Sequence, residues 1–325
     1  MIIRKKSSDC LTLLTLILML SCTGLSAVAK SAAPTDSQPV WESPLHQDHP
    51  LTGKIWLTAA QRFITRNELL SQLQQSPVLL LGEKHDNPDH HRLRLSLLDS
   101  LLSPGKKSLI ALEMMERRQQ THIDALATNY QGLQAAQLAD HLAWDEQGWP
   151  WQFYGPAVTL SLQRGASLAA GNIDSADVMA IYRDATPTAP QLLDTQQLAQ
   201  LERDIDSSHC GLLPAEQFPA MVRVQQARDQ KMADVLMSGR NTFDQRILLA
   251  GNYHIRRDLG VPNYLPGPMS RQSVSVAFLE VDPESDEPTA YLQQFSDVAA
   301  YDVIWFTPAL RQDDYCADMR AAQNP

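Results

Sequence analysis

The sequence predicts an α/β protein, with a parallel, doubly wound sheet flanked by helices and a smaller all-helical subdomain. Short apolar runs at 78–81 and 247–250 have the length and continuity of strands that are buried on both faces. Each run leads directly into a Gly-x-x-His turn, at 82–85 and 251–254. Further apolar runs alternate with helical patterns, and this alternation is typical of a parallel sheet.

The first 29 residues resemble an export segment. Basic residues at 4–6 precede an apolar run at 11–20, which is too short for a permanent membrane-spanning helix. The sequence Leu-Ser-Cys22 resembles a lipoprotein processing box and would place a lipid on Cys22, while Ala-Val-Ala at 27–29 fits ordinary signal cleavage. We therefore expect an exported lipoprotein, anchored to a membrane in the outer membrane or periplasm, with a soluble periplasmic protein as the alternative.

Residues 30–50 carry four prolines among polar side chains and are expected to form a tether, so that the folded domain spans 51–325. The chain has 27 basic and 37 acidic side chains. Removal of residues 1–22 takes away three basic side chains and one acidic side chain, which leaves 24 basic and 36 acidic side chains. The resulting net charge of −12 argues against nucleic acid as a partner, because nucleic-acid binding needs a basic surface.

Two cysteines, Cys210 and Cys316, remain once the export segment is set aside. In an oxidising compartment they could form a disulfide. Two unpaired core residues, or a thiolate ligand, are equally compatible with the sequence, because separation along the chain does not fix distance in space.

The individual elements follow from the spacing of apolar residues. Strands are expected at 55–57, 78–81, 108–112, 167–170, 246–250, 273–281 and 301–306. Helices are expected at 66–75, 115–128, 174–184 and 214–239. A further helix is expected to start at the turn 87–89 and to continue through the leucines that end at 102. Residues 121–164 and 186–240 are helical in pattern without buried strands, so we expect them to form the helical subdomain, with a cleft over the strand ends.

Five polar side chains stand where predicted strands end: Glu83, His85, Glu113, Asn172 and His254. If the strands are parallel neighbours, these side chains converge at one edge of the sheet, where open α/β sheets commonly bind ligands. Two imidazoles and two carboxylates could bind a divalent metal or exchange protons with a substrate. Alternatively, the two histidines cap the following helices or satisfy buried backbone groups.

His90 and His91 lie in the first turn of the helix after the 82–85 turn, and we expect them to be solvated rather than ligating. The stretch 144–156 holds three of the six tryptophans together with Tyr154. Such a cluster can line a flat apolar site and offer a phenol oxygen to ferric iron, or it can join helices to the sheet as a hydrophobic knot.

Seven separated motifs occur in a fixed order. They are Leu-Gly-Glu-Lys-His-Asp-Asn-Pro-Asp-His-His at 81–91, Ala-Leu-Glu-Met-Met-Glu-Arg at 111–117, Trp-Pro-Trp-Gln-Phe-Tyr-Gly-Pro at 149–156, Ala-Gly-Asn-Ile at 170–173, His-Cys-Gly-Leu-Leu-Pro at 209–214, Gln-Ala-Arg-Asp-Gln-Lys-Met-Ala at 226–233, and Ala-Gly-Asn-Tyr-His at 250–254 with Gly-Val-Pro at 260–262. Together they resemble the ChaN-like haem-binding uptake lipoproteins of the Tiki superfamily, over about residues 53–307.

The resemblance implies a parallel sheet flanked by helices with a smaller helical domain, and a role in haem and iron uptake. It also implies a homodimer that holds two haems face to face, with each ferric iron bound by a tyrosine of one copy and assisted by a histidine of the other. We assign the tyrosine to Tyr154, and the histidine first to His209, with His85 and His254 as rivals. Haem would be the cofactor, and the haem-uptake machinery would be the partner.

The alternative function is a metal-dependent hydrolase. Relatives with two Gly-x-x-His motifs include peptidases and esterases, so His85, His254, Glu83 and Glu113 could form a hydrolytic site around a divalent metal. Glu83 or Glu113 would then act as general base on a bound water. We expect a carrier rather than an enzyme.

Overall fold

A computed structural model describes residues 40–126, 133–184, 192–239, 242–292, 297–312, 316–317 and 319–320. The export segment at 1–29, with Cys22, and the first part of the expected tether lie outside the described residues. In the described part of the chain, no helix is long and apolar enough to cross a membrane.

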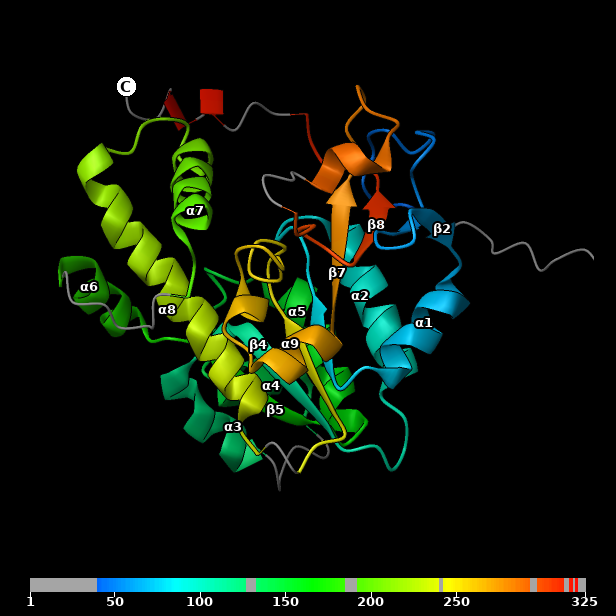
Figure 1. Cartoon of the computed structure of the whole chain (residues 1–325). Helices are drawn as coiled ribbons and strands as arrows, with labels where there is room; N and C mark the ends of the chain where they lie inside the picture. Colours follow the sequence, from blue (N-terminus) through cyan, green and yellow to red (C-terminus); the bar gives the residue numbers. More distant parts are fainter. Residues whose placement is uncertain are drawn as a thin grey trace, which may run out of the picture. The chain divides into compact units, whose positions relative to one another are not determined.

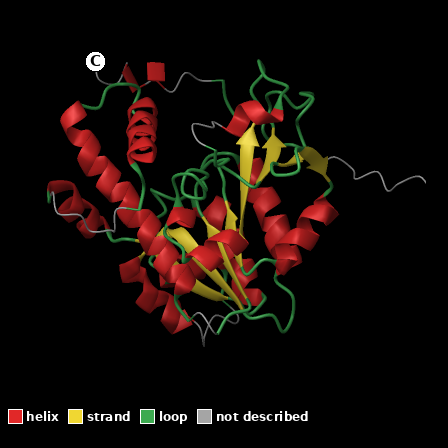
Figure 2. Cartoon of the chain, in the orientation of Figure 1, coloured by secondary structure: helices red, strands yellow, loops and turns green. Residues whose placement is uncertain are grey.

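Among the described residues, eight strands form one sheet in the order β2-β1-β8-β7-β3-β6-β4-β5 (Figures 1 and 2). Their bounds are β1 Ile55–Leu57, β2 Arg62–Ile64, β3 Val78–Leu81, β4 Ser108–Glu116, β5 Ser167–Asn172, β6 Gln245–Leu249, β7 Ser273–Glu280 and β8 Val303–Thr307. The six strands from β8 to β5 are parallel, which confirms the predicted fold class. The edge differs, because β1 pairs antiparallel with both β8 and β2.

Helices cover the two faces of this sheet. The bounds are α1 Arg66–Gln75, α2 Pro88–Leu101, α3 Gln120–Leu126, α4 Ala135–His141, α5 Trp151–Gln163, α6 Ser175–Arg183, α7 Thr195–Ser208, α8 Phe218–Met237 and α9 Gly267–Gln272. The strand β4 runs four residues further than the predicted 108–112. The helix expected from 115 therefore begins only after Glu116, as a 3₁₀ turn at Arg117–Gln119 followed by α3.

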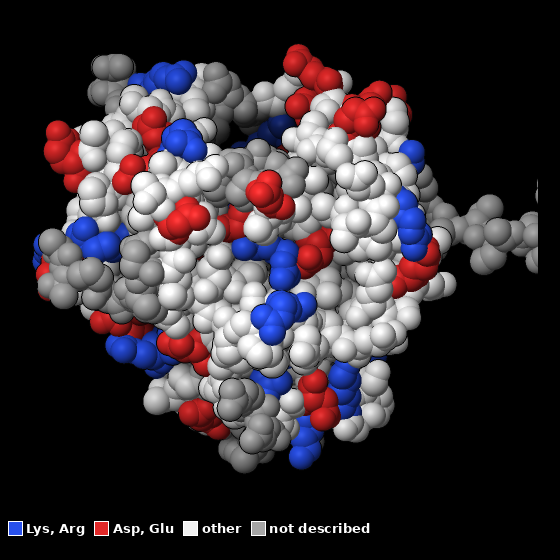
Figure 3. All heavy atoms as spheres, in the orientation of Figure 1, with Lys and Arg blue, Asp and Glu red and all other residues white. Residues whose placement is uncertain are grey.

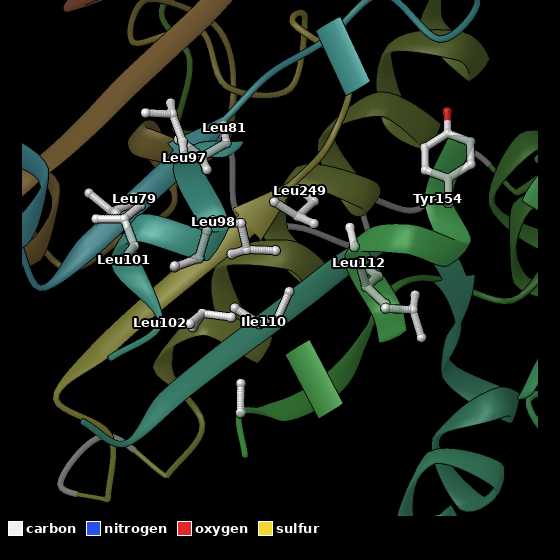
Figure 4. Close-up of a cluster of buried hydrophobic side chains, with 14 of the residues drawn as sticks. Leu79, Leu81, Leu97, Leu98, Leu101, Leu102, Ile110, Leu112, Tyr154 and Leu249 are labelled. Atoms are coloured by element: carbon white, nitrogen blue, oxygen red, sulfur yellow. The ribbon is translucent and has the colours of Figure 1, made fainter. Parts of the chain in front are cut away.

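Alternate residues of each strand face opposite layers. In β3, Leu79 and Leu81 pack with the leucines of α2 and with α5 (Figure 4). Val78 and Leu80 pack on the other face, in a cluster that includes Met232 of α8. Because both faces are covered, every side chain of β3 is buried, which explains the continuous apolar run in the sequence.

Only part of the expected helical subdomain separates from the sheet. Helix α5 packs on the sheet through Tyr154 and Val158. The second half of α8 packs on the other face through Met232 and Leu236, while Val222 in its first half packs with α7. Only α6, α7 and the first half of α8 therefore form the helical lobe seen at the left of Figure 1.

The second half of the expected tether belongs to the folded domain. The backbone N–H groups of Glu42 and Ser43 donate hydrogen bonds to the carboxylate of Asp89, and Leu45 forms a β-bridge with Ala309. Ser43 is fully buried. The boundary expected at residue 50 is thus wrong, because the backbone of this segment is held by hydrogen bonds to Asp89 of α2 and by the bridge to Ala309.

Charged side chains are mixed on the surface. On the face shown in Figure 3, Lys and Arg are interspersed with Asp and Glu.

Candidate functional site at the strand ends

Four of the five predicted strand-end residues form two adjacent groups at the carboxyl edge of the parallel strands. Glu83 and His85 follow β3, Glu113 lies within β4, and His254 lies in the loop after β6. Since β6 pairs with both β3 and β4, these side chains come together although they are distant in sequence. The expected convergence of parallel strand ends accounts for this placement.

The first group joins an exposed imidazole to a buried carboxylate. Nδ1 of His85 lies 2.7 Å from Oε1 of Glu83, whose side chain is fully buried, whereas 50% of the His85 side chain is exposed. Burial alone would lower the pKa of His85, but the hydrogen bond to Glu83 and its charge outweigh burial and raise that pKa. The carboxylate fixes the ring and leaves Nε2 as the nitrogen that faces away from it.

Gly251 makes room for this imidazole. A Cβ atom at this position would lie 2.9 Å from Cε1 and 3.2 Å from Nε2 of His85. The N–H of Gly251 donates a hydrogen bond of 2.7 Å to Glu113, so the glycine also links the two groups. This close approach gives a physical reason for glycine in the second Gly-x-x-His turn.

The second group is a histidine held between two carboxylates. Nε2 of His254 lies 3.3 Å from Oε1 of Glu113, and Nδ1 lies 2.6 Å from Oδ1 of Asp229 on α8. Burial would lower the pKa of His254, but the two carboxylates outweigh it and raise the pKa to about 10. Burial would likewise raise the pKa of Glu113, yet the charge of His254 holds it at about 2. His254 is therefore a buried cation, paired on both sides.

Tyr154 lies beside the first group, with its hydroxyl turned inward. The hydroxyl donates to Oε1 of Glu83 at 3.4 Å and lies 3.5 Å from Nδ1 of His85. Only 1% of the residue is exposed. Burial, followed by the charge of Glu83, raises the pKa of Tyr154. Figure 4 shows its ring at the edge of the leucine cluster and its hydroxyl pointing away from the leucines.

The tryptophan-rich stretch encloses Tyr154. The ring centroid of Trp149 lies 5.6 Å from that of Tyr154 and 4.9 Å from that of His85, edge to face in both cases. Trp144 and Trp151 pack against the same core. The stretch thus packs as a hydrophobic knot, and Trp149 also contacts the exposed imidazole of His85.

The expectation that His90 and His91 are solvated is wrong. His90 is fully buried, accepts a hydrogen bond from the Lys84 N–H through Nδ1 and contacts Thr307 through Nε2. His91 lies 3.0 Å from the carbonyl oxygen of His85 and stacks on Phe153. Burial, followed by the charge of Arg94, lowers the pKa of His91 to about 4. The first turn of α2 begins at the Asn87 cap and packs against Thr307 of β8 and Phe153 of α5.

Two charged residues of the site were not predicted. Arg94 is 1% exposed, and its guanidinium lies 3.9 Å from Glu83 and 3.2 Å from Nδ1 of His91. Asp229 pairs with His254. Arg94 and Asp229 each stand inside a helix among apolar residues. A charged residue at an apolar position of a helix is the one sequence signal that could have indicated them.

The other predicted site residues lie outside the two groups. Asn172 donates from Nδ2 to the backbone carbonyl of Glu113 at 3.0 Å and so supports the strand. His209 ends α7, with Nδ1 2.7 Å from the carbonyl of Ile205. The next residue, Cys210, forms a disulfide with Cys316, and their Cα atoms are 5.2 Å apart.

A pocket of about 360 Å³ opens at the strand ends. It is lined by residues that include His85, Asn252, Tyr253, His254, Phe278 and Glu280. Within the described part of the chain, no three His, Cys, Asp or Glu side chains are arranged to hold a metal ion, so a divalent metal lacks support. The arrangement can present one imidazole to a ligand, next to aromatic rings.

Comparisons with known proteins identify the family and the fold. The family model "Haem-binding uptake, Tiki superfamily, ChaN" matches residues 69–265, a range that contains both groups. Among solved structures, ChaN of Campylobacter jejuni, described with cofacial haem binding, is 26% identical with a TM-score of 0.65, over 77% of this chain and 95% of that chain. An erythromycin esterase EreC variant in its open conformation is 14% identical with a TM-score of 0.46, over 86% and 100% of the two chains. No protein among those curated by function matches the sequence.

Proposed function

Because the chain belongs to the ChaN family of haem-binding uptake proteins in the Tiki superfamily, we propose that it carries haem during haem and iron uptake. The observation that carries this proposal is the half-exposed imidazole of His85, which is held by a buried carboxylate, contacts the ring of Trp149 and lines a pocket together with Phe278. An imidazole or phenol donor next to flat apolar surface is the combination that haem iron and its macrocycle require.

The size of the strand-end pocket suits a haem that is shared between two copies of the protein. A pocket of 360 Å³ lies near the lower end of the range of about 300–1,000 Å³ for ligand pockets, so one copy would enclose only part of a haem. A second copy facing the first would cover the rest. We therefore include in the proposal a homodimer with two haems held face to face; for ChaN of Campylobacter jejuni, cofacial haem binding is described.

The resemblance implies that Tyr154 binds the haem iron and that His209 of the other copy assists. The hydroxyl of Tyr154 is enclosed by Glu83, His85 and Trp149, so Tyr154 would reach a haem only if His85 and Trp149 moved. Among the described residues, no contact joins His209 to the strand-end groups. A role for His209 at the haem would therefore come from the facing copy.

Export is the third part of the proposal. The segment at 1–29 would direct the chain out of the cytoplasm, and a lipid on Cys22 would anchor it where haem-uptake machinery could deliver or receive haem. A single acyl chain gives only marginal membrane binding, so a stable anchor requires more than one chain on the N-terminal residue.

A hemin titration of residues 31–325 tests the proposal. This fragment retains the whole compact unit that begins at Pro39. A saturable change in the Soret band would support haem carriage. A change that rises without saturation as hemin is added would reject it.

A further inference from the structure

We infer that Trp149 is a cover over Tyr154, and that the tyrosine becomes accessible to haem only after the Trp149 ring has turned away from it. This inference rests on the proposed haem-binding function and on Tyr154 as the iron ligand that the resemblance implies. It adds the residue that controls access to that ligand.

The hydroxyl of Tyr154 is closed off from solvent. Only 1% of the residue is exposed, and its hydroxyl lies 3.4 Å from Oε1 of Glu83 and 3.5 Å from Nδ1 of His85. The rings of Trp149 and Trp144 pack on the same tyrosine, with centroid separations of 5.6 and 6.1 Å. A flat ligand cannot meet the hydroxyl in this arrangement, so at least one neighbour must move first.

The charged neighbours of the tyrosine are fixed by the fold. Glu83 directly follows β3, His91 and Arg94 belong to α2, and all three are more than nine-tenths buried. The guanidinium of Arg94 lies 3.9 Å from Glu83. His85 is half exposed, but its ring is held by Glu83 at 2.7 Å. Displacement of these residues would separate a buried charge from its partners, which is costly.

The ring of Trp149 is held only by contacts with other rings. The residue is half-buried, and within the described part of the chain its indole N–H has no hydrogen-bond partner. Its ring meets those of His85 and Tyr154 edge to face. Such aromatic contacts are individually weak, and they can be replaced by contacts with another flat, apolar surface. Trp149 is therefore the neighbour that can leave Tyr154 at the lowest cost.

The backbone of Trp149 is anchored, so the movement is confined to its side chain. Its N–H donates to the carbonyl oxygen of Asp145 at 2.9 Å, and its own carbonyl oxygen accepts from Nε1 of Trp144 at 2.7 Å. Trp144 in turn packs edge to face on Trp151, at 4.9 Å. The preceding residues 145–148 are all exposed, so a ring that turns toward them enters solvent.

Hemin association and chemical access to Tyr154 test the inference separately. Hemin is mixed by stopped flow with residues 31–325 of the wild type, Trp149→Ala and Tyr154→Phe. Trp41→Ala is the matched control, because Trp41 is also half-buried and packs against the same hydrophobic core. The second measurement needs no haem. Tetranitromethane nitrates accessible tyrosines, and peptide mass spectrometry compares Tyr154 with Tyr182 of α6, which is half-buried elsewhere in the chain.

We expect Trp149→Ala to bind hemin about 10-fold faster than the wild type or more, because a minor open state is typically populated at about 0.1–10%. Nitration of Tyr154 relative to Tyr182 should rise by a similar factor. Trp41→Ala should match the wild type in both measurements, and Tyr154→Phe should lose the tyrosinate band of bound hemin.

A second substitution guards against a loosened core in Trp149→Ala. Trp149→Leu keeps an apolar side chain at the position but removes most of the cover, so it should also bind hemin faster than the wild type. Thermal unfolding of each variant without hemin verifies that it is folded.

The contrary results separate the inference from the proposed function. Equal association rates in the wild type, Trp149→Ala and Trp149→Leu, with saturable binding in each, would overturn the cover and leave the haem carrier standing. A tyrosinate band that survives in Tyr154→Phe would do the same, because the covered residue would not be the ligand. If the wild type shows no saturable hemin binding, the proposed function fails. Equal nitration of Tyr154 with and without the indole would then reject the cover as well.

Discussion

Nδ1 of His254 lies 2.6 Å from Oδ1 of Asp229, and this contact joins the loop after β6 to the middle of helix α8. The same imidazole reaches Glu113 of β4 on its other side. One buried cation therefore connects the sheet, the second Gly-x-x-His turn and the helix that carries the helical lobe. We therefore interpret His254, Glu113 and Asp229 as a structural group, since their charges are already paired.

We predict that His254→Gln strongly destabilises the fold. Glutamine fills much of the space but removes the positive charge, which leaves the carboxylates of Glu113 and Asp229 buried without a counter-charge. Breaking a buried ion pair in this way costs about 3–5 kcal/mol. Denaturant unfolding measures the loss, with the exposed His122→Gln as control. A loss below about 1 kcal/mol would show that the buried carboxylates do not depend on His254.

From the buried positive charge of His254 we predict that the stability of the fold declines at alkaline pH. The pKa of His254 is raised from 6.5 to about 10 in the folded state, so the folded protein keeps a proton that the unfolded chain releases. Its contribution to stability is complete below pH 6.5 and disappears as the pH rises through about 10. Unfolding free energies measured across this range should fall more steeply for the wild type than for His254→Gln. Parallel curves would contradict the prediction.

The disulfide predicts a large effect of reduction on stability. Cys210 and Cys316 are 106 residues apart, and closing a loop of about 100 residues restricts the unfolded chain by up to about 4.7 kcal/mol in the chain-entropy model. A reductant, or the double replacement by serine, should lower the unfolding free energy by about 2–5 kcal/mol. The serine variant is its own control, because reductant should not affect it further. Equal stability with and without reductant in the wild type would contradict the bond's contribution.

Processing at the N-terminus gives a separate prediction. Mass spectrometry of protein expressed with its export segment should find Cys22 as the first residue, with acyl chains attached. Cys22→Ser should abolish the acylated species. A mature chain that begins at Lys30 without lipid would instead indicate ordinary signal cleavage and a soluble exported protein.

The sequence predicted the convergence of the strand-end residues for a physical reason. Continuous apolar runs identify strands buried on both faces, and parallel neighbours place their carboxyl ends along one edge. Glu83, His85, Glu113 and His254 come together because β6 pairs with both β3 and β4, an adjacency that the sequence analysis had to assume.

Helix faces were harder to predict than strand ends. His90, His91 and Arg94 are polar residues at the start of α2, and sequence patterning favours solvent for such residues. Their burial depends on the angle at which α2 leaves the 82–85 turn, which is set by contacts with residues 41–45, β8 and α5. The position of Asp229 opposite His254 likewise depends on how α8 packs across the sheet, and spacing along the chain carries no signal for it.

The measurement that tests the central claim most directly is a hemin titration of residues 31–325, followed by size-exclusion chromatography with detection of both protein and haem. We predict saturation near one haem per chain, and elution of the haem with a dimer of the protein. Elution of haem-free monomer after a titration without saturation would contradict the assignment of this chain as a haem carrier.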